Sequence, residues 1–154
     1  MKALLMRLFP GRVDNDFDGH RAALWLLGLF VALKLAMGVN SILNTASVAA
    51  GADGLPLDSF GPAAARAVLM LFALVALGQL TLAAIALIAL VRYRAMVPLM
   101  FLVLLGEQLV RRFIVQVYAV ERTEGFPPGW YVNIGLLVLL AIGLVLSLWP
   151  ARRR

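Results

Sequence analysis

The stretch Ala22–Leu43 reads AALWLLGLFVALKLAMGVNSIL and decides the fold, because Lys34 is its one charged residue. An α-helix rises about 1.5 Å per residue, so about 20 apolar residues cross the roughly 30 Å hydrocarbon core of a bilayer. The stretch therefore predicts a membrane-spanning helix over residues 22–43.

Three further apolar runs of similar length follow, at residues 63–91, 95–120 and 130–149. Only Arg92, Tyr93 and Arg94 separate the first two of these runs, which predicts a tight antiparallel hairpin. The sequence thus predicts an all-α fold, an integral membrane four-helix bundle in which residues 1–154 form a single domain. We expect residues 1–21 to be a cytoplasmic interfacial segment that is not cleaved as a signal peptide.

The composition of the chain agrees with a membrane protein and excludes several other classes. Of 154 residues, 63% are hydrophobic and 14% are charged, whereas soluble domains are about half apolar and a quarter charged. A soluble domain of this size has too much surface to hide so much apolar material. The chain contains no cysteine, which excludes disulfides, thiolate metal sites and cysteine nucleophiles.

The positive charges flank the apolar runs and predict the orientation of the chain. Nine of the 14 Lys and Arg residues lie at Lys2, Arg7, Arg12, Arg21, Arg92, Arg94 and positions 152–154, whereas the loop at 44–62 has none and the loop at 121–129 has only Arg122. The positive-inside rule then places both termini in the cytoplasm, and Trp and Tyr residues at the ends of the runs agree with this topology. Since the basic residues flank the spans, the net charge of +6 does not indicate nucleic-acid binding. The excess of Arg over Lys favours a bacterial inner (plasma) membrane.

Three polar residues fall inside the predicted spans, at about the same depth. Lys34, Gln79 and Glu107 each lie about 18 Å from the cytoplasmic end of their span, at 1.5 Å per residue. Charged groups at that depth cost roughly 2.5–3.5 kcal/mol and usually face the bundle and find partners. We therefore expect an intramembrane polar layer with a Lys34–Glu107 contact. Arg111, one helical turn beyond Glu107, is a second possible partner.

The outer half of the third span is also polar. Its residues and those of the first span at similar depth predict a cavity that opens outward, formed by Arg111, Arg112, Gln116, Asn40 and Asn44. Two arginines suit an anionic headgroup, a carboxylate or a quinone-like carbonyl. The alternative is purely structural: ion pairs fix the helix register and the arginines snorkel to the interface.

The first span has two faces on which a second helix could pack closely, so we expect it to be wedged between two helices. One face carries Gly28, Ala32, Ala36 and Asn40, and the other carries Lys34, Gly38 and Ser41. Gln79 shares a stripe with Phe72, Ala76, Ala83 and Ala86. The loop at residues 51–62 is expected to fold back as a lid or to present a partner surface.

Residues 14–19 read DNDFDG, which matches the first half of a calcium loop, but Trp25 stands where the bidentate Glu belongs. The favoured interpretation is that Asp18 caps the first span. His20, the only histidine, is either a haem ligand or, as we favour, an interfacial or capping residue. No catalytic motif occurs, so we expect neither an enzyme nor a bound cofactor or metal.

The function predicted is that of an accessory or assembly subunit of a larger membrane complex, or an oligomeric membrane scaffold. The alternative is a small transporter or a lipid- or anionic-ligand-binding protein that uses the outward polar cavity. The expected partners are membrane lipids and either other membrane subunits or further copies of the chain, with no nucleic acid.

Overall fold

The computed structural model describes residues 2–118 and 127–150, with side chains from residue 5 onward. In this part of the chain all regular secondary structure is helical. The elements are α1 (Lys2–Leu8), α2 (Ala22–Leu43), α3 (Thr45–Gly51), the short 3₁₀-helix Leu57–Ser59, α4 (Pro62–Arg92), the 3₁₀-helix Arg94–Met96, α5 (Val97–Val117) and α6 (Pro128–Leu148). The all-α prediction is confirmed.

Three of these helices are long and apolar enough to cross a membrane, namely α2, α4 and α6. They correspond to the predicted spans 22–43, 63–91 and 130–149. Helix α5 has 21 residues, as α6 does, but carries Glu107, Arg111 and Arg112. Its role as a fourth span therefore stays a prediction, and positions 119–120 of that predicted span lie outside the described residues.

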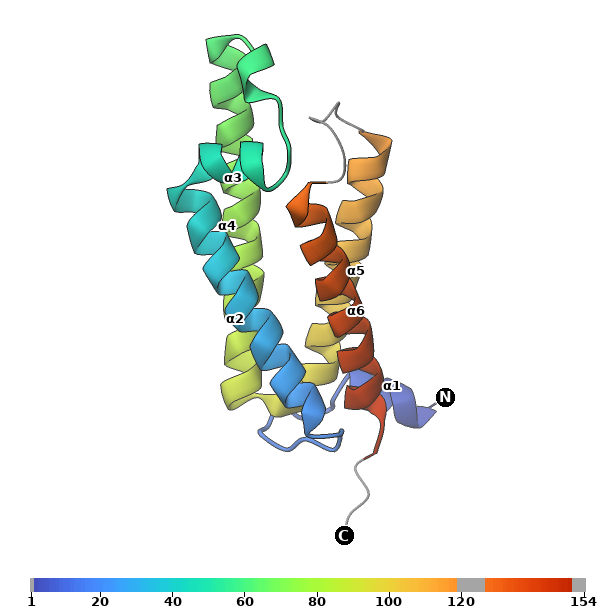
Figure 1. The fold of residues 1–154 in the computed structure, drawn as a ribbon. Coiled ribbons are helices and arrows are strands. Elements are labelled where there is room, and N and C mark those ends of the chain that lie inside the picture. The colour runs from blue at the N-terminus through green and yellow to red at the C-terminus, as the bar shows by residue number, and fades with distance from the viewer. Residues whose placement is uncertain (1, 119–126, 151–154) are drawn as a thin grey trace.

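The long helices are arranged around α2, which packs extensively against both α4 and α6, while α5 packs mainly against α6 (Figure 1). Helices α4 and α5 contact each other much less than α4 contacts α2. The predicted short connection is present, through Tyr93 and the 3₁₀-helix Arg94–Met96, but the predicted tight packing of α4 against α5 is not. The reason is that the small-residue face of α4, which includes Ala76, Ala83 and Ala86, is buried against α2 and draws the two helices together.

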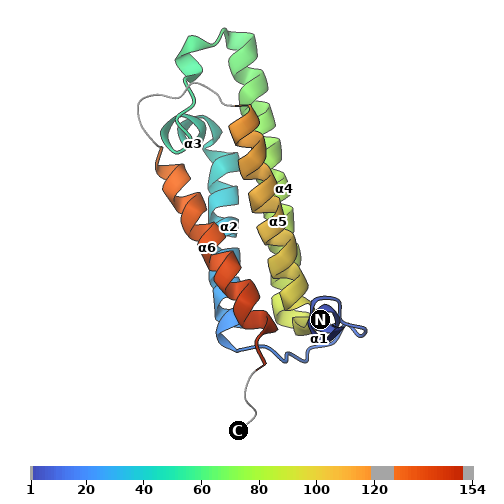
Figure 2. The same cartoon turned by 90° about the vertical axis from the view of Figure 1, so that its right-hand side faces the viewer.

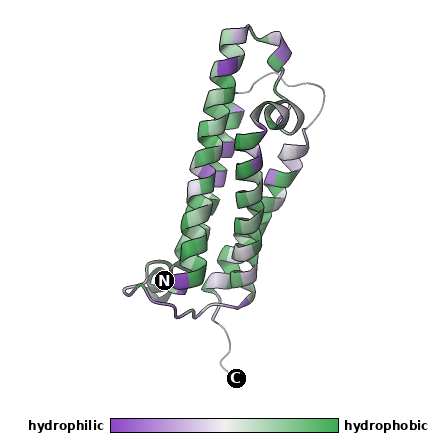
Figure 3. Cartoon of the chain, turned by 90° about the vertical axis from the view of Figure 1, so that its left-hand side faces the viewer, coloured by the Kyte–Doolittle hydropathy of each residue, from purple (hydrophilic) through white to green (hydrophobic). Residues whose placement is uncertain are grey.

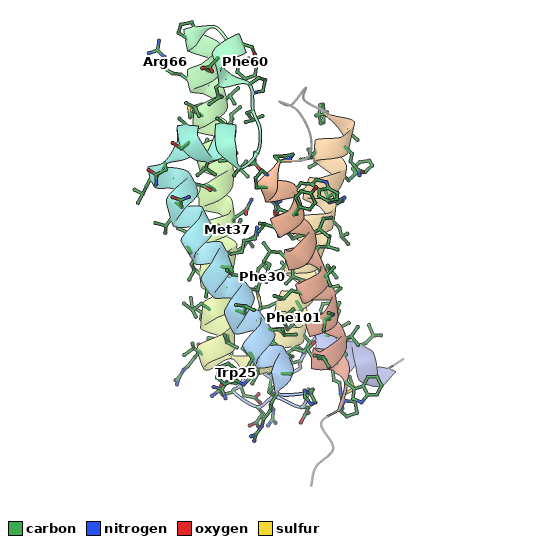
Figure 4. All side chains as sticks on the ribbon, viewed as in Figure 1. Trp25, Phe30, Met37, Phe60, Arg66 and Phe101 are labelled. Atoms are coloured by element: carbon green, nitrogen blue, oxygen red, sulfur yellow. The ribbon has the colours of Figure 1, made fainter. Side chains whose placement is uncertain are left out.

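The core lies among all four long helices, and α4 contributes Ala86 and Ala89 to it. Its largest fully buried side chains include Phe30 from α2 and Phe101 from α5, which are labelled in Figure 4. Gly143 of α6 lies directly against the Phe101 ring, and Gly38 of α2 lies against Leu80 of α4. Two glycines thus permit two of the helix–helix contacts.

Helix α2 is wedged between two neighbours, as the small residues predicted, but its two small faces contribute unequally. Of the Gly28 face, only Gly28 itself is half-buried, against Leu90 of α4. Lys34 and Gly38 are buried, whereas Ala32, Ala36 and Asn40 are exposed. That part of the prediction was wrong, because bulky residues of the core, Phe30 among them, turn the Lys34 side of the helix inward.

Helix α1 lies across the ends of α5 and α6, at the end of the molecule where both termini are found (Figures 1 and 2). The ribbons of the long helices are mostly hydrophobic, with hydrophilic residues at the two ends and a few at mid-height (Figure 3). Leu5, Met6 and Phe9 of the N-terminal segment are more than half exposed. Exposed apolar side chains at that level suit a segment in the membrane interface.

Candidate functional site

Lys34 is almost completely buried, with 4% of its surface exposed, and it joins α2 to α4. Its ammonium Nζ donates a hydrogen bond of 2.9 Å to Oε1 of Gln79 and lies 6.0 Å from the centroid of the Phe30 ring. The alanine face of α4 brings Gln79 close enough for this bond, because small residues let the two backbones approach. A buried charge therefore has a polar partner on the neighbouring helix.

Glu107 is held differently, within its own helix. Its carboxylate Oε1 lies 3.2 Å from Nε of Arg111, one turn further along α5. The same arginine donates hydrogen bonds to Gln108 and, at 3.4 Å, to Asn133 of α6. The ion pair within α5 is thus linked to α6 through Arg111.

The three residues of the predicted polar layer line one small gap. Lys34, Gln79 and Glu107 surround a space of about 10 Å³, together with four apolar residues, Phe30, Leu82, Ala83 and Leu104. That volume is at the lower limit for a single water molecule. The structure thus brings these three residues to one gap, and their common depth in a membrane stays a prediction.

The direct Lys34–Glu107 ion pair is not formed between these described residues, since Lys34 bonds to Gln79 and Glu107 pairs with Arg111. The helix geometry explains the difference. Residues four apart on a helix are neighbours whatever the tertiary packing. Arg111 therefore reaches Glu107 without any particular arrangement of the other helices. The second partner considered for Glu107 is the one it has.

The residues of the predicted outward cavity do not come together and have four separate placements. Arg111 belongs to the ion pair with Glu107, and Arg112 lies over the Trp130 ring, with 5.5 Å between its guanidinium carbon and the ring centroid. Gln116 is exposed. Asn44 donates a hydrogen bond of 2.8 Å to Asn40 on the exposed side of α2, and no hydrogen bond connects either asparagine to the two arginines.

Gln108 was not predicted to be one of the buried polar residues around Glu107 and Arg111. It is 4% exposed, its Oε1 accepts from Arg111, and its Nε2 is buried without a partner among the described residues. The sequence signal was available, because positions 101, 104, 108 and 111 lie on one stripe of a helix. Phe101 and Leu104 on that stripe are core residues, so Gln108 had to face inward as well.

The polar cluster continues to the end of the molecule opposite the termini. Asn133 Nδ2 donates a 2.8 Å hydrogen bond to the carbonyl oxygen of Gly129, and the Gly129 N–H donates 2.9 Å to the carbonyl of Ala52. A Cβ at position 129 would lie 2.7 Å from that carbonyl, so the contact requires glycine. This bond ties Ala52, at the start of the loop after α3, to the start of α6. The lid or partner surface expected at residues 51–62 stays a prediction.

The aspartates of the DNDFDG stretch lie in the segment between α1 and α2. Within residues 2–118 and 127–150, no three His, Cys, Asp or Glu side chains come together in a way that could hold a metal ion. Asp14 instead accepts a hydrogen bond of 3.2 Å from the backbone of Asp16. The predicted cap of α2 by Asp18 is wrong: Nδ1 of His20 accepts a hydrogen bond from the N–H of Ala22, at 3.2 Å. His20 is therefore a capping residue.

No protein family, no curated protein and no solved structure matches this chain.

Proposed function

We propose that the chain is a four-span protein of a bacterial inner membrane with α5 as the fourth span and both termini in the cytoplasm. The pairing of Glu107 with Arg111 supports α5 as a span, because paired charges cost less to insert than free ones. Arg92 and Arg94 flank the turn before α5, which bonds to the N-terminal segment through Ala95 and Asp14. They therefore lie at the same end as the termini, as the positive-inside rule requires. Trp25 and Trp149 are strongly exposed at that end and fit an aromatic belt.

Its proposed function is non-catalytic: an accessory or assembly subunit of a larger membrane complex, or a scaffold made of several copies. The observation that carries this proposal is the 10 Å³ gap among Lys34, Gln79 and Glu107. A transport site needs space for its substrate, whereas these polar groups surround room for one water at most. The side chains of the polar layer therefore stabilise one particular packing of the helices.

Two surfaces support association with a partner. The first part of α4, near Arg66, projects beyond the other long helices, and most of its residues are exposed (Figures 1 and 4). On α2, Ala32 and Ala36 remain exposed, and small residues on a membrane helix let a second helix approach closely.

The competing hypothesis, a small transporter or a lipid- or anionic-ligand-binding protein, uses Arg111, Arg112 and Gln116. It is less well supported, because Arg111 is already paired and Arg112 lies over Trp130. If it holds, Arg112→Ala abolishes ligand binding or transport while the amount of folded protein stays the same.

The test of the proposed function is the native mass of the tagged chain after gentle extraction from its own membrane. We expect a species that contains other polypeptides, or several 16.7 kDa chains. A monomer with no other polypeptide would overturn the proposal.

A pair of variants locates the contact. Ala36→Leu adds bulk to the exposed small-residue side of α2, and Ala84→Leu adds the same bulk to an exposed position of α4. We expect only Ala36→Leu to reduce the native mass, with both variants folded to the same degree. An equal effect of the two would assign the contact to another face.

A further inference from the structure

A cavity of about 700 Å³ lies at the end of the molecule that carries both termini, away from the polar layer. Most of its wall comes from the N-terminal segment between Met6 and Gly19. The rest comes from Ala95 in the turn before α5, from Pro98 in the first turn of α5, and from Ser147 near the end of α6. Cavities of roughly 300–1,000 Å³ are the usual size of small-molecule sites.

Backbone contacts hold the cavity walls in place. The Asp14 carbonyl accepts a hydrogen bond of 3.3 Å from the N–H of Ala95, and the N–H of His20 donates 3.0 Å to the carbonyl of Leu146. Gly19 lies so close to the carbonyl of Ser147 that any Cβ would overlap it. The N-terminal segment is therefore fixed both to the 3₁₀-helix that precedes α5 and to the end of α6.

The charged side chains of the cavity have both signs. Arg7 and Arg12 supply two guanidinium groups, and Asp14, Asp16 and Asp18 supply three carboxylates. Nη1 of Arg7 donates a hydrogen bond of 2.7 Å to the carbonyl oxygen of Leu148, which holds this guanidinium group at the cavity wall.

The remaining charges are available for a ligand. No hydrogen bond or ion pair to a described residue occupies the guanidinium of Arg12 or the carboxylates of Asp16 and Asp18, and all three residues are exposed. A ligand that satisfies both signs needs an anionic group, which arginine binds through several N–H donors, and a cationic group with N–H donors for the carboxylates.

The position of the cavity indicates where such a ligand comes from. The cavity lies beyond the ends of the apolar helices, at the level of exposed Trp25 and Trp149, which is the headgroup level of a bilayer if these helices span it. Met6, which lines the cavity, is exposed together with Leu5 and Phe9. These side chains offer an apolar surface to acyl chains beside the opening.

We propose that this cavity binds the headgroup of a phospholipid that carries both a phosphate and a primary ammonium, as phosphatidylethanolamine does. The phosphate contacts Arg7 and Arg12, and the ammonium donates to Asp16 and Asp18. Phosphatidylglycerol has no cation for the carboxylates, and the methylated ammonium of phosphatidylcholine has no N–H to donate. The inference requires a membrane location but not the accessory-subunit function.

The test is lipid binding by the purified full chain, followed by native mass spectrometry with the three lipids in matched acyl chains. We expect phosphatidylethanolamine to bind about tenfold more tightly than either of the others, a difference that one charge-assisted pair can supply. Equal binding of the three lipids would overturn the proposal. A preference for phosphatidylglycerol would overturn it too, because it would reflect general attraction of a basic surface to anionic lipid.

Matched variants test the residues. Arg12→Gln and Asp16→Asn are each expected to remove the preference for phosphatidylethanolamine, since each removes one of the two charge contacts. Arg92→Gln and Asp58→Asn change exposed residues of the same types outside the cavity, and they should leave the preference for phosphatidylethanolamine unchanged. If the cavity variants bind like these controls, the assignment is wrong.

Glycerophosphoethanolamine, the headgroup without acyl chains, distinguishes a lipid from a free solute. Displacement of the bound lipid by this probe at similar concentration would support a headgroup site that soluble esters can also fill. Retention of the lipid in its presence would support a site for the membrane lipid alone.

Discussion

Lys34 and Glu107 have similar predicted depths, yet the two charges are stabilised in different ways. Lys34 is 4% exposed and bonds to Gln79 across the α2–α4 contact, whereas 28% of the Glu107 side chain is exposed and its partner Arg111 is on the same helix. An interhelical partner ties two helices together, while a partner one turn away stabilises a single helix. The comparison therefore assigns the first pair to tertiary structure and the second mainly to α5 itself.

The largest effect in this comparison is expected from Gln79→Leu. The substitution removes the acceptor and leaves the Lys34 ammonium buried, which costs about 3 kcal/mol in the free energy of unfolding. The measurement is unfolding of the purified chain in mixed micelles by titration with a denaturing detergent.

Thr81→Val is the control on the same helix, because the Thr81 hydroxyl is exposed and bonds only to its own helix, at Leu77. We expect it to change the free energy of unfolding by less than about 0.5 kcal/mol. Similar losses in the two variants would mean that the Lys34–Gln79 bond is not a tie between helices.

A second effect tests whether apolar packing, as well as Arg111, joins α5 to α6. In Gly143→Ala the new Cβ overlaps the Phe101 ring, and we expect a loss of about 2 kcal/mol in the free energy of unfolding from overpacking. Gly135→Ala on the same helix meets no atom within 4 Å and should be neutral or slightly stabilising.

The double variant Gly143→Ala with Phe101→Leu sharpens this prediction. A smaller side chain at position 101 relieves the overlap, so the double variant should lose less than the sum of the two single losses. Strict additivity would show that position 143 does not act through Phe101.

A smaller effect is expected from Glu107→Gln. Arg111 loses one partner but keeps Gln108 and Asn133, and a pair at this spacing on a partly exposed helix is worth about 0.5 kcal/mol. The free energy of unfolding should fall by no more than that amount. A loss as large as that of Gln79→Leu would remove the distinction between the two pairs.

Periodicity and length predicted the helices well, since predicted span 22–43 coincides with α2 and span 63–91 differs from α4 by one residue at each end. These features depend on local apolar content, which a single sequence carries in full. The alanine stripe likewise identified the side of α4 on which Gln79 lies, because a helix fixes the angle between its residues.

The choice of partners could not be predicted in the same way. A lysine side chain is long enough to reach either Gln79 or Glu107, and only the relative placement of α2, α4 and α5 decides between them. The weak α4–α5 contact and the separation of Asn40 from Arg111 have the same origin, because they follow from how whole helices pack. The capping of α2 by His20 depends on the orientation of one imidazole ring, which the spacing of residues along the sequence does not specify.

The smallest expected effect is the coupling between Lys34 and Glu107, measured by a double-mutant cycle of Lys34→Met and Glu107→Gln. Glu107 is already paired with Arg111, so Lys34 faces a nearly neutral pair, and the coupling should lie below about 0.5 kcal/mol. The parallel cycle of Lys34→Met and Gln79→Leu should give about 2 kcal/mol, because the leucine is harmless once the buried ammonium is gone. If the first coupling equals or exceeds the second, Lys34 and Glu107 interact directly in the membrane, and the polar layer is one network instead of two separate pairs.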